Sequence, residues 1–185
     1  HRRLRRRPAD AGRQASLPAS LHPVLRRVYG ARGLAGDSDL DLSLERLLPV
    51  GTLGGLDAAV DLLLACRRRG GQVLVVGDFD ADGATSTALV VRQLRRLGFA
   101  EPSYLVPDRF KFGYGLTPGI VRVAARRRPG LIVTVDNGIS SLEGVAEARR
   151  LGTEVLVTDH HLPGASLPDA AAIVNPHLAG ERFAS

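Results

Sequence analysis

The chain has 185 residues, of which 44% are hydrophobic, and a formal net charge of +6. This length and apolar content suffice for the core of one ordinary domain with a small appended subdomain. The sequence contains no run of 18 apolar residues, and no apolar signal-peptide core follows its cationic start, so we expect a cytoplasmic protein without a membrane span. The single cysteine, Cys66, excludes an intramolecular disulfide and is expected to be a small buried side chain.

The positive charge is concentrated at the N-terminus. Six arginines and one aspartate in residues 1–13 contribute +5, which leaves only +1 for the rest of the chain. A basic run of this kind is typical of a solvated tail. The net charge is therefore weak evidence for a nucleic-acid partner.

The first 71 residues are predicted to form a basic, irregular tail over 1–18 and a helical preface over 19–71. Apolar residues recur at helical spacing over 21–28, 41–48 and 56–69. Two glycines at 70 and 71 give the stop signal of the last helix. The apolar stripe of that helix is predicted to consist of Leu56, Ala59, Val60, Leu63 and Leu64. We find no chemistry-bearing motif in this part.

From Val73 onward, short apolar runs alternate with helical patterns. The expected strands are 73–76, 103–107, 131–135, 154–158 and 171–174, and the expected helices are 84–97, 117–128 and 140–151. Strands that are apolar throughout and alternate with helices are typical of a parallel sheet covered on both faces. The sequence therefore predicts a doubly wound, mostly parallel α/β domain over residues 72–185.

Acidic residues and histidines follow three of these strands. Ligands of such sheets bind outside the carboxyl ends of the strands, so these side chains are expected to meet at one edge. One such residue alone is compatible with a turn or a helix cap, but three strand ends together are not. Crowded carboxylates require a cation, and a divalent metal is the simplest one. The residues concerned are Asp78, Asp80 and Asp82, then Asp136, then Asp159, His160 and His161.

The donor set contains carboxylates and imidazoles but no thiolate. Such donors suit Mn²⁺ or Mg²⁺ better than a thiolate-selecting zinc site. We expect two ions that share one carboxylate, the usual arrangement for phosphoryl transfer. The side chains of adjacent histidines diverge, so one is free to bind metal while its neighbour faces a phosphate oxygen.

The segment 107–117, PDRFKFGYGLT, combines an arginine with three aromatic residues. Arginine is a planar donor suited to phosphate, and aromatic rings stack on unpaired bases. We therefore expect Arg109 and Tyr114 to bind substrate. The alternative is that the aromatic side chains pack the loop onto the core, and for Phe110 the two alternatives are equally open.

Four motifs, VGDFDADGATS, RFKFGYGL, VTVDNGIS and VTDHHLPG, resemble those of the DHH phosphoesterase superfamily, and the match runs from about Leu21 to Pro176. The superfamily is named after the Asp-His-His triplet found here at 159–161. The resemblance implies a metal-dependent phosphodiesterase, most similar to the single-strand-specific 5′→3′ DNA exonucleases of bacterial repair and recombination. It also implies single-stranded DNA as substrate, and a repair helicase and a single-strand-binding protein as partners.

The resemblance further implies a role for each strand-end residue. Asp80, Asp82 and His160 would bind metal, and Asp136 would bridge two metals. His161 would contact phosphate, which completes the set of five expected catalytic residues. The residues expected to support this set without binding the metal are Asp78, Asp159 and Asn137.

Proteins of this kind continue beyond the position of Ser185 with a further metal-binding aspartate, a second domain and an oligonucleotide-binding fold. We therefore expect the 185-residue chain by itself to be weakly active or inactive. The alternatives are a DHH-family pyrophosphatase or small-nucleotide phosphodiesterase, or a non-catalytic nucleic-acid-binding module. A haloacid-dehalogenase-type phosphatase fits less well, because Lys111 is the sole lysine and the histidine pair would have no role. Neither phosphate-loop fingerprint occurs.

Overall fold

The computed structural model describes residues 11–34, 36–181 and 183, and the chain divides into two compact units, 1–48 and 49–185. The first unit contains α1 (Ala11–Ser16), α2 (Pro23–Ala31) and the 3-10 turns η1 (Asp37–Leu40) and η2 (Leu44–Arg46). The predicted irregular tail is thus wrong for 11–16, which are helical, while residues 1–10 lie outside the described residues.

The helix predicted over 41–48 is also wrong, because this stretch forms only the short turn η2. A local side-chain bond competes with the helix here, since Asp41 Oδ1 accepts a hydrogen bond from the Ser43 backbone N–H at 3.0 Å. Pro49 follows directly and disfavours a helical conformation at the preceding residue.

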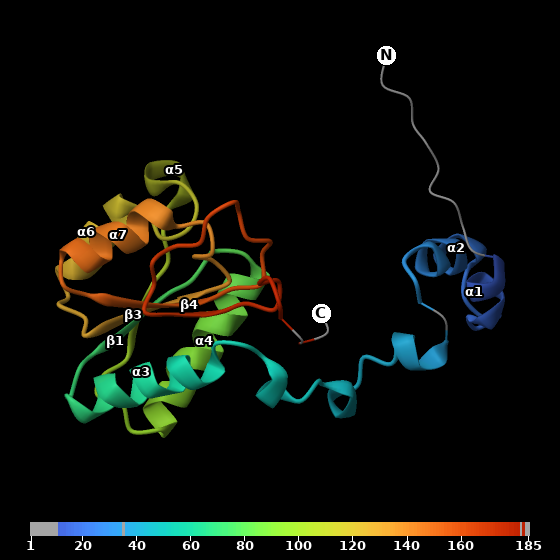
Figure 1. Ribbon diagram of the computed structural model, residues 1–185, viewed down its shortest axis with the longest axis horizontal. Coiled ribbons are helices and arrows are strands. Elements are labelled where there is room, and N and C mark those ends of the chain that lie inside the picture. Colours follow the sequence, from blue (N-terminus) through green and yellow to red (C-terminus); the bar gives the residue numbers. More distant parts are fainter. Residues whose placement is uncertain (1–10, 35, 182, 184–185) are drawn as a thin grey trace, which may run out of the picture. The chain divides into compact units, whose positions relative to one another are not determined.

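The second unit is built on a five-stranded parallel sheet with strand order β2-β1-β3-β4-β5, and the alternating pattern predicted such a sheet. Figure 1 labels its three central strands, β1, β3 and β4. The ends of its helices and strands differ from the predicted ones by at most three residues. The strands are β1 (Val73–Val76), β2 (Ser103–Leu105), β3 (Leu131–Val135), β4 (Glu154–Thr158) and β5 (Ala172–Val174). The other elements are η3 (Val50–Thr52), α3 (Leu56–Arg68), α4 (Ala81–Arg96), α5 (Arg109–Phe112), α6 (Pro118–Ala125) and α7 (Leu142–Arg150).

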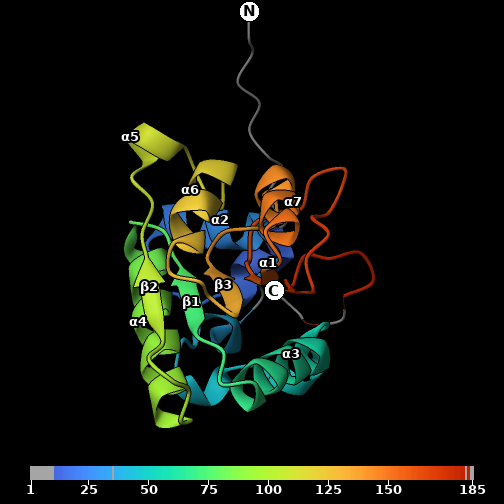
Figure 2. The ribbon, with the colours of Figure 1, turned by 90° about the vertical axis from the view of Figure 1, so that its left-hand side faces the viewer.

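Helices cover both faces of the sheet (Figures 1 and 2): α6 and α7 lie on one face, and α3 and α4 lie on the other. Because side chains alternate along a strand, β1 contributes Val73 and Val75 to the α3–α4 face and Leu74 and Val76 to the α6–α7 face. All four are fully buried. A strand buried on both faces explains why its sequence is apolar throughout.

Helix α3 packs on the sheet through part of the predicted stripe. Ala59 and Leu63 pack in the core as predicted, whereas Val60 and Leu64 are exposed, so the prediction is wrong for these two residues. The prediction of a small buried cysteine is confirmed, and burial raises the pKa of the Cys66 thiol. The unit that contains the sheet begins at residue 49, and the predicted division into 1–18, 19–71 and 72–185 stays a prediction.

No single helix among the described residues is long and apolar enough to cross a membrane; the segments 44–52 and 56–68 reach that length only together, across a bend of 81°.

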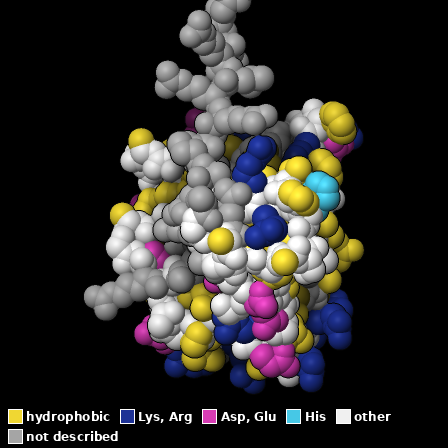
Figure 3. Space-filling model, turned by 90° about the vertical axis from the view of Figure 1, so that its right-hand side faces the viewer, with side chains coloured by type: hydrophobic (Ala, Val, Ile, Leu, Met, Phe, Trp, Pro, Cys, Tyr) yellow, Lys and Arg dark blue, Asp and Glu magenta, His cyan; other side chains and the backbone are white. Residues whose placement is uncertain are grey.

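On the face drawn in Figure 3, basic side chains lie among acidic and hydrophobic ones.

A three-residue charge cluster joins α6 to α7. Glu147 accepts hydrogen bonds from Arg150 Nε at 2.8 Å and from an Arg122 nitrogen at 3.0 Å. The bond from Arg150, followed by the one from Arg122, lowers the pKa of the Glu147 carboxyl to about 2.

We expect Glu147→Gln to destabilise the protein at neutral pH but not near pH 2. A carboxyl whose folded-state pKa is depressed adds stability above its unfolded pKa of about 4.3, and that stability is lost as the pH falls through the folded-state value. Urea unfolding of both proteins between pH 2 and pH 7 measures the difference, with Glu143→Gln on the same helix as the control. Parallel pH curves for the two proteins would contradict the assignment.

Candidate metal centre

The chain leaves β1 through a tight turn that presents three aspartates at one edge of the sheet. Asp78 is buried, whereas Asp80 caps α4 and accepts a hydrogen bond from the Gly83 N–H at 3.0 Å. This backbone donor lowers the pKa of Asp80. The helix thus begins at Ala81, three residues before its predicted start, because the capping carboxylate recruits the next residues into the first turn. Asp82 lies exposed in that turn.

Asp136 follows β3 in a left-handed conformation, with a φ of 61°. Few residues other than glycine adopt this region, and it concentrates at functional sites. Two hydrogen bonds hold the backbone there: Asp136 N–H donates to Thr158 O at 3.1 Å, and the Tyr114 hydroxyl donates to Asp136 O at 3.2 Å. Burial and the neighbouring Asp80 carboxylate raise the pKa of Asp136, while the His160 ring opposes this shift.

The Asp-His-His triplet follows β4 and is organised by the buried Asp159. Its Oδ1 accepts the backbone N–H groups of His160 at 2.8 Å and His161 at 3.1 Å, and its Oδ2 accepts that of Ile139 at 2.9 Å. The same carboxylate lies 2.7 Å from His161 Nδ1, and this hydrogen bond raises the pKa of His161. His160 turns the other way, with Nε2 at 2.8 Å from Asp136 Oδ1. The two ring centroids lie 4.8 Å apart, with the ring planes tilted by 53°, so the division of the histidines between metal and phosphate stays a prediction.

Two clusters of potential metal ligands meet at this edge, each with its donor atoms within 4.8 Å of one another. Asp136 belongs to both, once with the two histidines and once with Asp78 and Asp80. Asp82 belongs to neither, but it lines a hollow of about 330 Å³ together with Asp136 and His160. A carboxylate shared by two clusters is the arrangement that two bridged cations require, and its oxygen and imidazole donors suit Mn²⁺ or Mg²⁺.

Arg109 is held against the same edge. Its guanidinium pairs with Asp78 through two nitrogens and lies 3.7 Å from Asp80 Oδ2. It also covers the ring of Phe79 at 4.2 Å and that of Tyr114 at 5.0 Å. The arginine thus neutralises part of the acidic charge, and the pairing with Asp78 was not foreseen from the sequence.

The predicted loop 107–117 contains the short helix α5, because Asp108 caps it by accepting the Phe110 N–H at 3.0 Å. Phe110 is fully exposed, so it does not pack the loop onto the core. Phe112 does pack on the core. Burial raises the pKa of Tyr114 to about 12, so its hydroxyl stays protonated as a donor at neutral pH.

Two buried asparagines tie the strand ends together. Asn137 Nδ2 donates to Val76 O at 3.0 Å and to Val135 O at 2.8 Å, which joins the ends of β1 and β3. Asn175 was missed in the sequence, although it directly follows β5 and thus obeys the same strand-end rule as the aspartates. Its Nδ2 donates to His161 O at 2.9 Å, so it fixes the triplet from the neighbouring strand.

Gly83 sets how closely α4 approaches the end of β1. A Cβ at this position would lie 2.5 Å from Asp78 O, closer than any ordinary contact with a backbone atom. We expect Gly83→Ala to displace the first turn of α4, to lower stability by about 1–3 kcal/mol and to weaken Mn²⁺ binding. Urea unfolding and calorimetric titration measure the two effects.

The control is Gly51→Ala, because a Cβ at Gly51 would meet nothing within 4 Å. If both variants retain the stability and the Mn²⁺ affinity of the parent chain, close packing at Gly83 does not shape the site.

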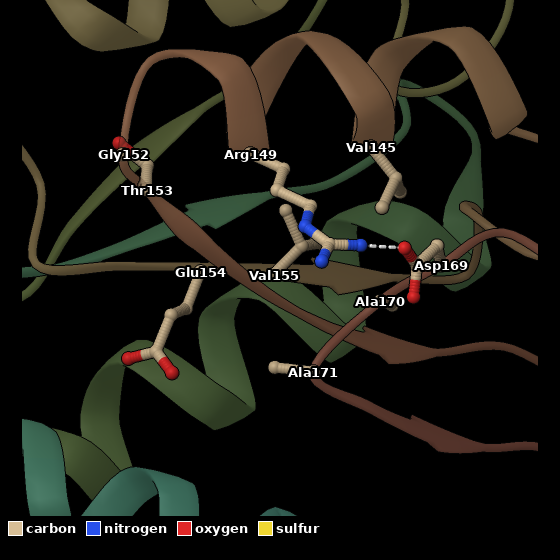
Figure 4. A pocket seen from close by; sticks show the side chains of 9 residues that line it. All are labelled: Val145, Arg149, Gly152, Thr153, Glu154, Val155, Asp169, Ala170 and Ala171. Atoms are coloured by element: carbon tan, nitrogen blue, oxygen red, sulfur yellow. Dashed lines mark ion pairs between the residues drawn. The ribbon is translucent and has the colours of Figure 1, made fainter.

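A separate hollow of about 420 Å³ lies at the opposite end of β4, between α7 and the segment that leads into β5. Figure 4 shows the ion pair between Arg149 and Asp169 across it, with Glu154 at the start of the strand. None of the predicted site residues lines this hollow. It is therefore distinct from the strand-end cluster, which consists of the potential ligands Asp78, Asp80, Asp136, His160 and His161.

Comparison with known proteins gave matches over most of the chain. Residues 72–184 match the family model described as DHH family, N-terminal domain. The single-stranded-DNA-specific exonuclease RecJ of Salmonella typhimurium is 55% identical over 184 residues, which are 100% of this chain and 32% of the relative. This chain thus spans about a third of the length of that relative.

Two solved structures are similar in fold. Exonuclease RecJ bound to manganese superposes with a TM-score of 0.64 at 39% identity, over 76% of this chain and 34% of the other. RecJ in complex with Mn²⁺ from Thermus thermophilus gives 0.63 at 34% identity, over 92% and 24%. Both are manganese complexes, and manganese is the type of ion that the donor set of the strand-end cluster suits.

Proposed function

Because this chain belongs to the DHH family, we propose that its strand-end cluster binds Mn²⁺ or Mg²⁺ and forms the catalytic centre of a single-strand-specific 5′→3′ DNA exonuclease. The observation that carries the proposal is the Asp136 carboxylate, which is common to both clusters of potential ligands. The RecJ relatives and the manganese complexes support the same substrate and metal.

In this proposal Asp80, Asp82, Asp136 and His160 would hold the metal, and Asp136, which belongs to both clusters, would be the carboxylate shared by two ions. When bound, the metal supplies Lewis-acid stabilisation of the negative charge that develops on the phosphoryl group. Metal binding requires ionised carboxylates, and the Gly83 N–H that lowers the pKa of Asp80 favours this state. A bound cation would also relieve the burial and the repulsion that raise the pKa of Asp136.

His161, Arg109 and Tyr114 face the substrate in this proposal. Asp159 engages Nδ1 of His161, which leaves Nε2 as the ring nitrogen that donates to a phosphate oxygen when the ring is protonated, and the bond to Asp159 raises the pKa of His161 and so favours that state. Arg109 binds Asp78 through Nε and Nη2 and keeps one further nitrogen, Nη1, as a donor in the plane of the guanidinium. Asp78, Asp159 and Asn137 keep these groups in position through the hydrogen bonds described above.

We further propose that the protein acts in the cytoplasm, in DNA repair and recombination, together with a repair helicase and a single-strand-binding protein. These proposals rest on the family alone. They extend the metal-dependent chemistry, which the geometry itself supports.

One assay separates this function from its alternatives. The test compares release of 5′-mononucleotides from a 5′-phosphorylated single strand with hydrolysis of pyrophosphate and of a dinucleotide, each with Mn²⁺ and with EDTA. A protein of the length of the RecJ relatives that carries these residues is expected to release mononucleotides only from the single strand and only with Mn²⁺. Preference for pyrophosphate or the dinucleotide would replace the proposal with another DHH-type activity, and no hydrolysis of any substrate would leave a binding module.

A further inference from the structure

A groove leads away from the metal centre along the outer edge of the sheet. It begins at Asp78 and Phe79, beside the cluster, in a hollow of about 580 Å³ between α4 and β2. A second hollow of about 640 Å³ continues from it, and Arg95, Tyr104 and Val106 line both. Because β2 is the edge strand of the sheet, this groove is not covered by another strand of the described chain (Figure 2).

Two aromatic rings lie along the groove, and both are more exposed than a core role requires. Phe79 and Tyr104 are each 57% exposed, although a large aromatic side chain gains most of its stabilising effect from burial. Side chains alternate along β2, so that Leu105 packs against the core on the α6–α7 face while Tyr104 lines the groove beside α4. Exposed rings at the walls of a groove are suited to stack on bases.

The charge of the groove is complementary to a phosphate backbone. Arg92 and Arg95 project from α4 and Arg127 follows α6; within the described chain, neither Arg92 nor Arg95 has a carboxylate at ion-pair distance. The acidic residues of the groove are Asp78 and Glu101, and Asp78 forms an ion pair with Arg109.

An edge strand such as β2 is also covered when a further strand pairs with its backbone. The residues around β2 disfavour that pairing. Arg127 donates to the Tyr104 carbonyl at 2.9 Å, which occupies an acceptor that an added strand needs. Pro102 and Pro107 flank β2 and have no N–H to offer.

We propose that this groove, lined by Phe79, Arg92, Arg95, Tyr104 and Arg127, binds the single strand beyond the nucleotide held at the metal centre. The inference rests on the proposed function, since it extends the substrate path of the same site. Tyr104 and the face of Phe79 that Arg109 leaves open stack on bases, and the three arginines bind phosphates. Sequence selectivity is not expected, because stacking and charge act on every nucleotide alike.

The test measures binding of a 3′-labelled twelve-nucleotide oligo(dT) to the 185-residue chain by fluorescence anisotropy, in EDTA so that the strand is not hydrolysed. Tyr104→Ala is expected to weaken binding about tenfold, whereas Tyr104→Phe keeps the ring and the affinity. The double variant Arg92→Gln/Arg95→Gln is expected to reduce the slope of log K against log salt by about 1.4. Arg149→Gln, the same type of change at the hollow on the other side of the sheet, is expected to leave the affinity unchanged.

The outcomes separate the groove from the metal centre. Equal affinity of the parent and both groove variants, or of an abasic strand and oligo(dT), would overturn the proposal, as would no affinity of the parent chain at low salt. If Tyr104→Ala leaves the affinity for DNA unchanged but weakens the binding of an apolar peptide, the groove belongs to a protein partner instead. The thermal shift with Mn²⁺ reports on the metal centre alone and is expected to be the same in the groove variants.

Discussion

Mn²⁺ is expected to raise the thermal midpoint of the 185-residue chain by about 5–10 °C at a metal concentration of about 100 times its Kd. A ligand that binds only the folded state stabilises it by about 2.7 kcal/mol at that concentration, and each kcal/mol is worth about 2–4 °C for a chain of this size. Asp136→Asn is expected to remove most of this increase, because Asp136 is shared by both clusters of potential ligands.

Without metal, Asp136→Asn is not expected to lose stability. Burial and Asp80 raise the folded-state pKa of Asp136, and a carboxyl with a raised folded-state pKa costs stability once the pH exceeds that value. Asp136→Asn is therefore expected to be at least as stable as the parent chain in EDTA at neutral pH. The control is Asp169→Asn, which removes a carboxylate far from the cluster. An unchanged response of Asp136→Asn to Mn²⁺ would show that the metal binds elsewhere.

The 185-residue chain by itself is expected to degrade single-stranded DNA at least about 100-fold more slowly than a full-length relative, such as the RecJ of Salmonella typhimurium. Hydrolysis needs the strand held in register as well as a metal centre, and a misplacement of about 1 Å costs about this factor. The residues after 13 carry a net charge of only +1, and affinity for a nucleic-acid backbone depends on the number of phosphates neutralised.

This expectation is checked by single-turnover release of 5′-mononucleotides, with the 185-residue chain and the full-length relative at equal concentration. Asp136→Ala in each protein measures the background from contaminating nucleases. The expectation is contradicted if the two rates lie within tenfold of each other and Asp136→Ala abolishes both. Residues of this chain alone would then position the strand.

The fold was predictable because its strands are buried on both faces. Such strands must be apolar along their whole length, so β1, β3 and β4 were found within their observed bounds from the sequence. The ends of helices are decided by single side chains, and this is where prediction failed: the Asp80 cap moved the start of α4 toward the strand. In the same way Asp41 and Pro49 limited 41–48 to a 3-10 turn.

The position of the candidate site was predictable from the sequence, but the contacts between its side chains were not. Strand ends of a parallel sheet meet at one edge, so the convergence of Asp80, Asp136 and His160 follows from the topology. The bond between Arg109 and Asp78 joins residues 31 positions apart and depends on how α5 folds over the sheet. Asp82 occupies the hollow without joining either cluster, which is a consequence of its place in the first turn of α4.

The most direct test of the metal centre is anomalous diffraction from crystals of the 185-residue chain soaked in Mn²⁺, with data collected on both sides of the manganese absorption edge. We expect a manganese peak at bonding distance from a carboxylate oxygen of Asp136, with Asp80, Asp82 or His160 completing the ligands. A second peak on the other side of Asp136 would complete the two-metal arrangement. No peak near Asp136, or peaks only at other acidic residues, would contradict the account.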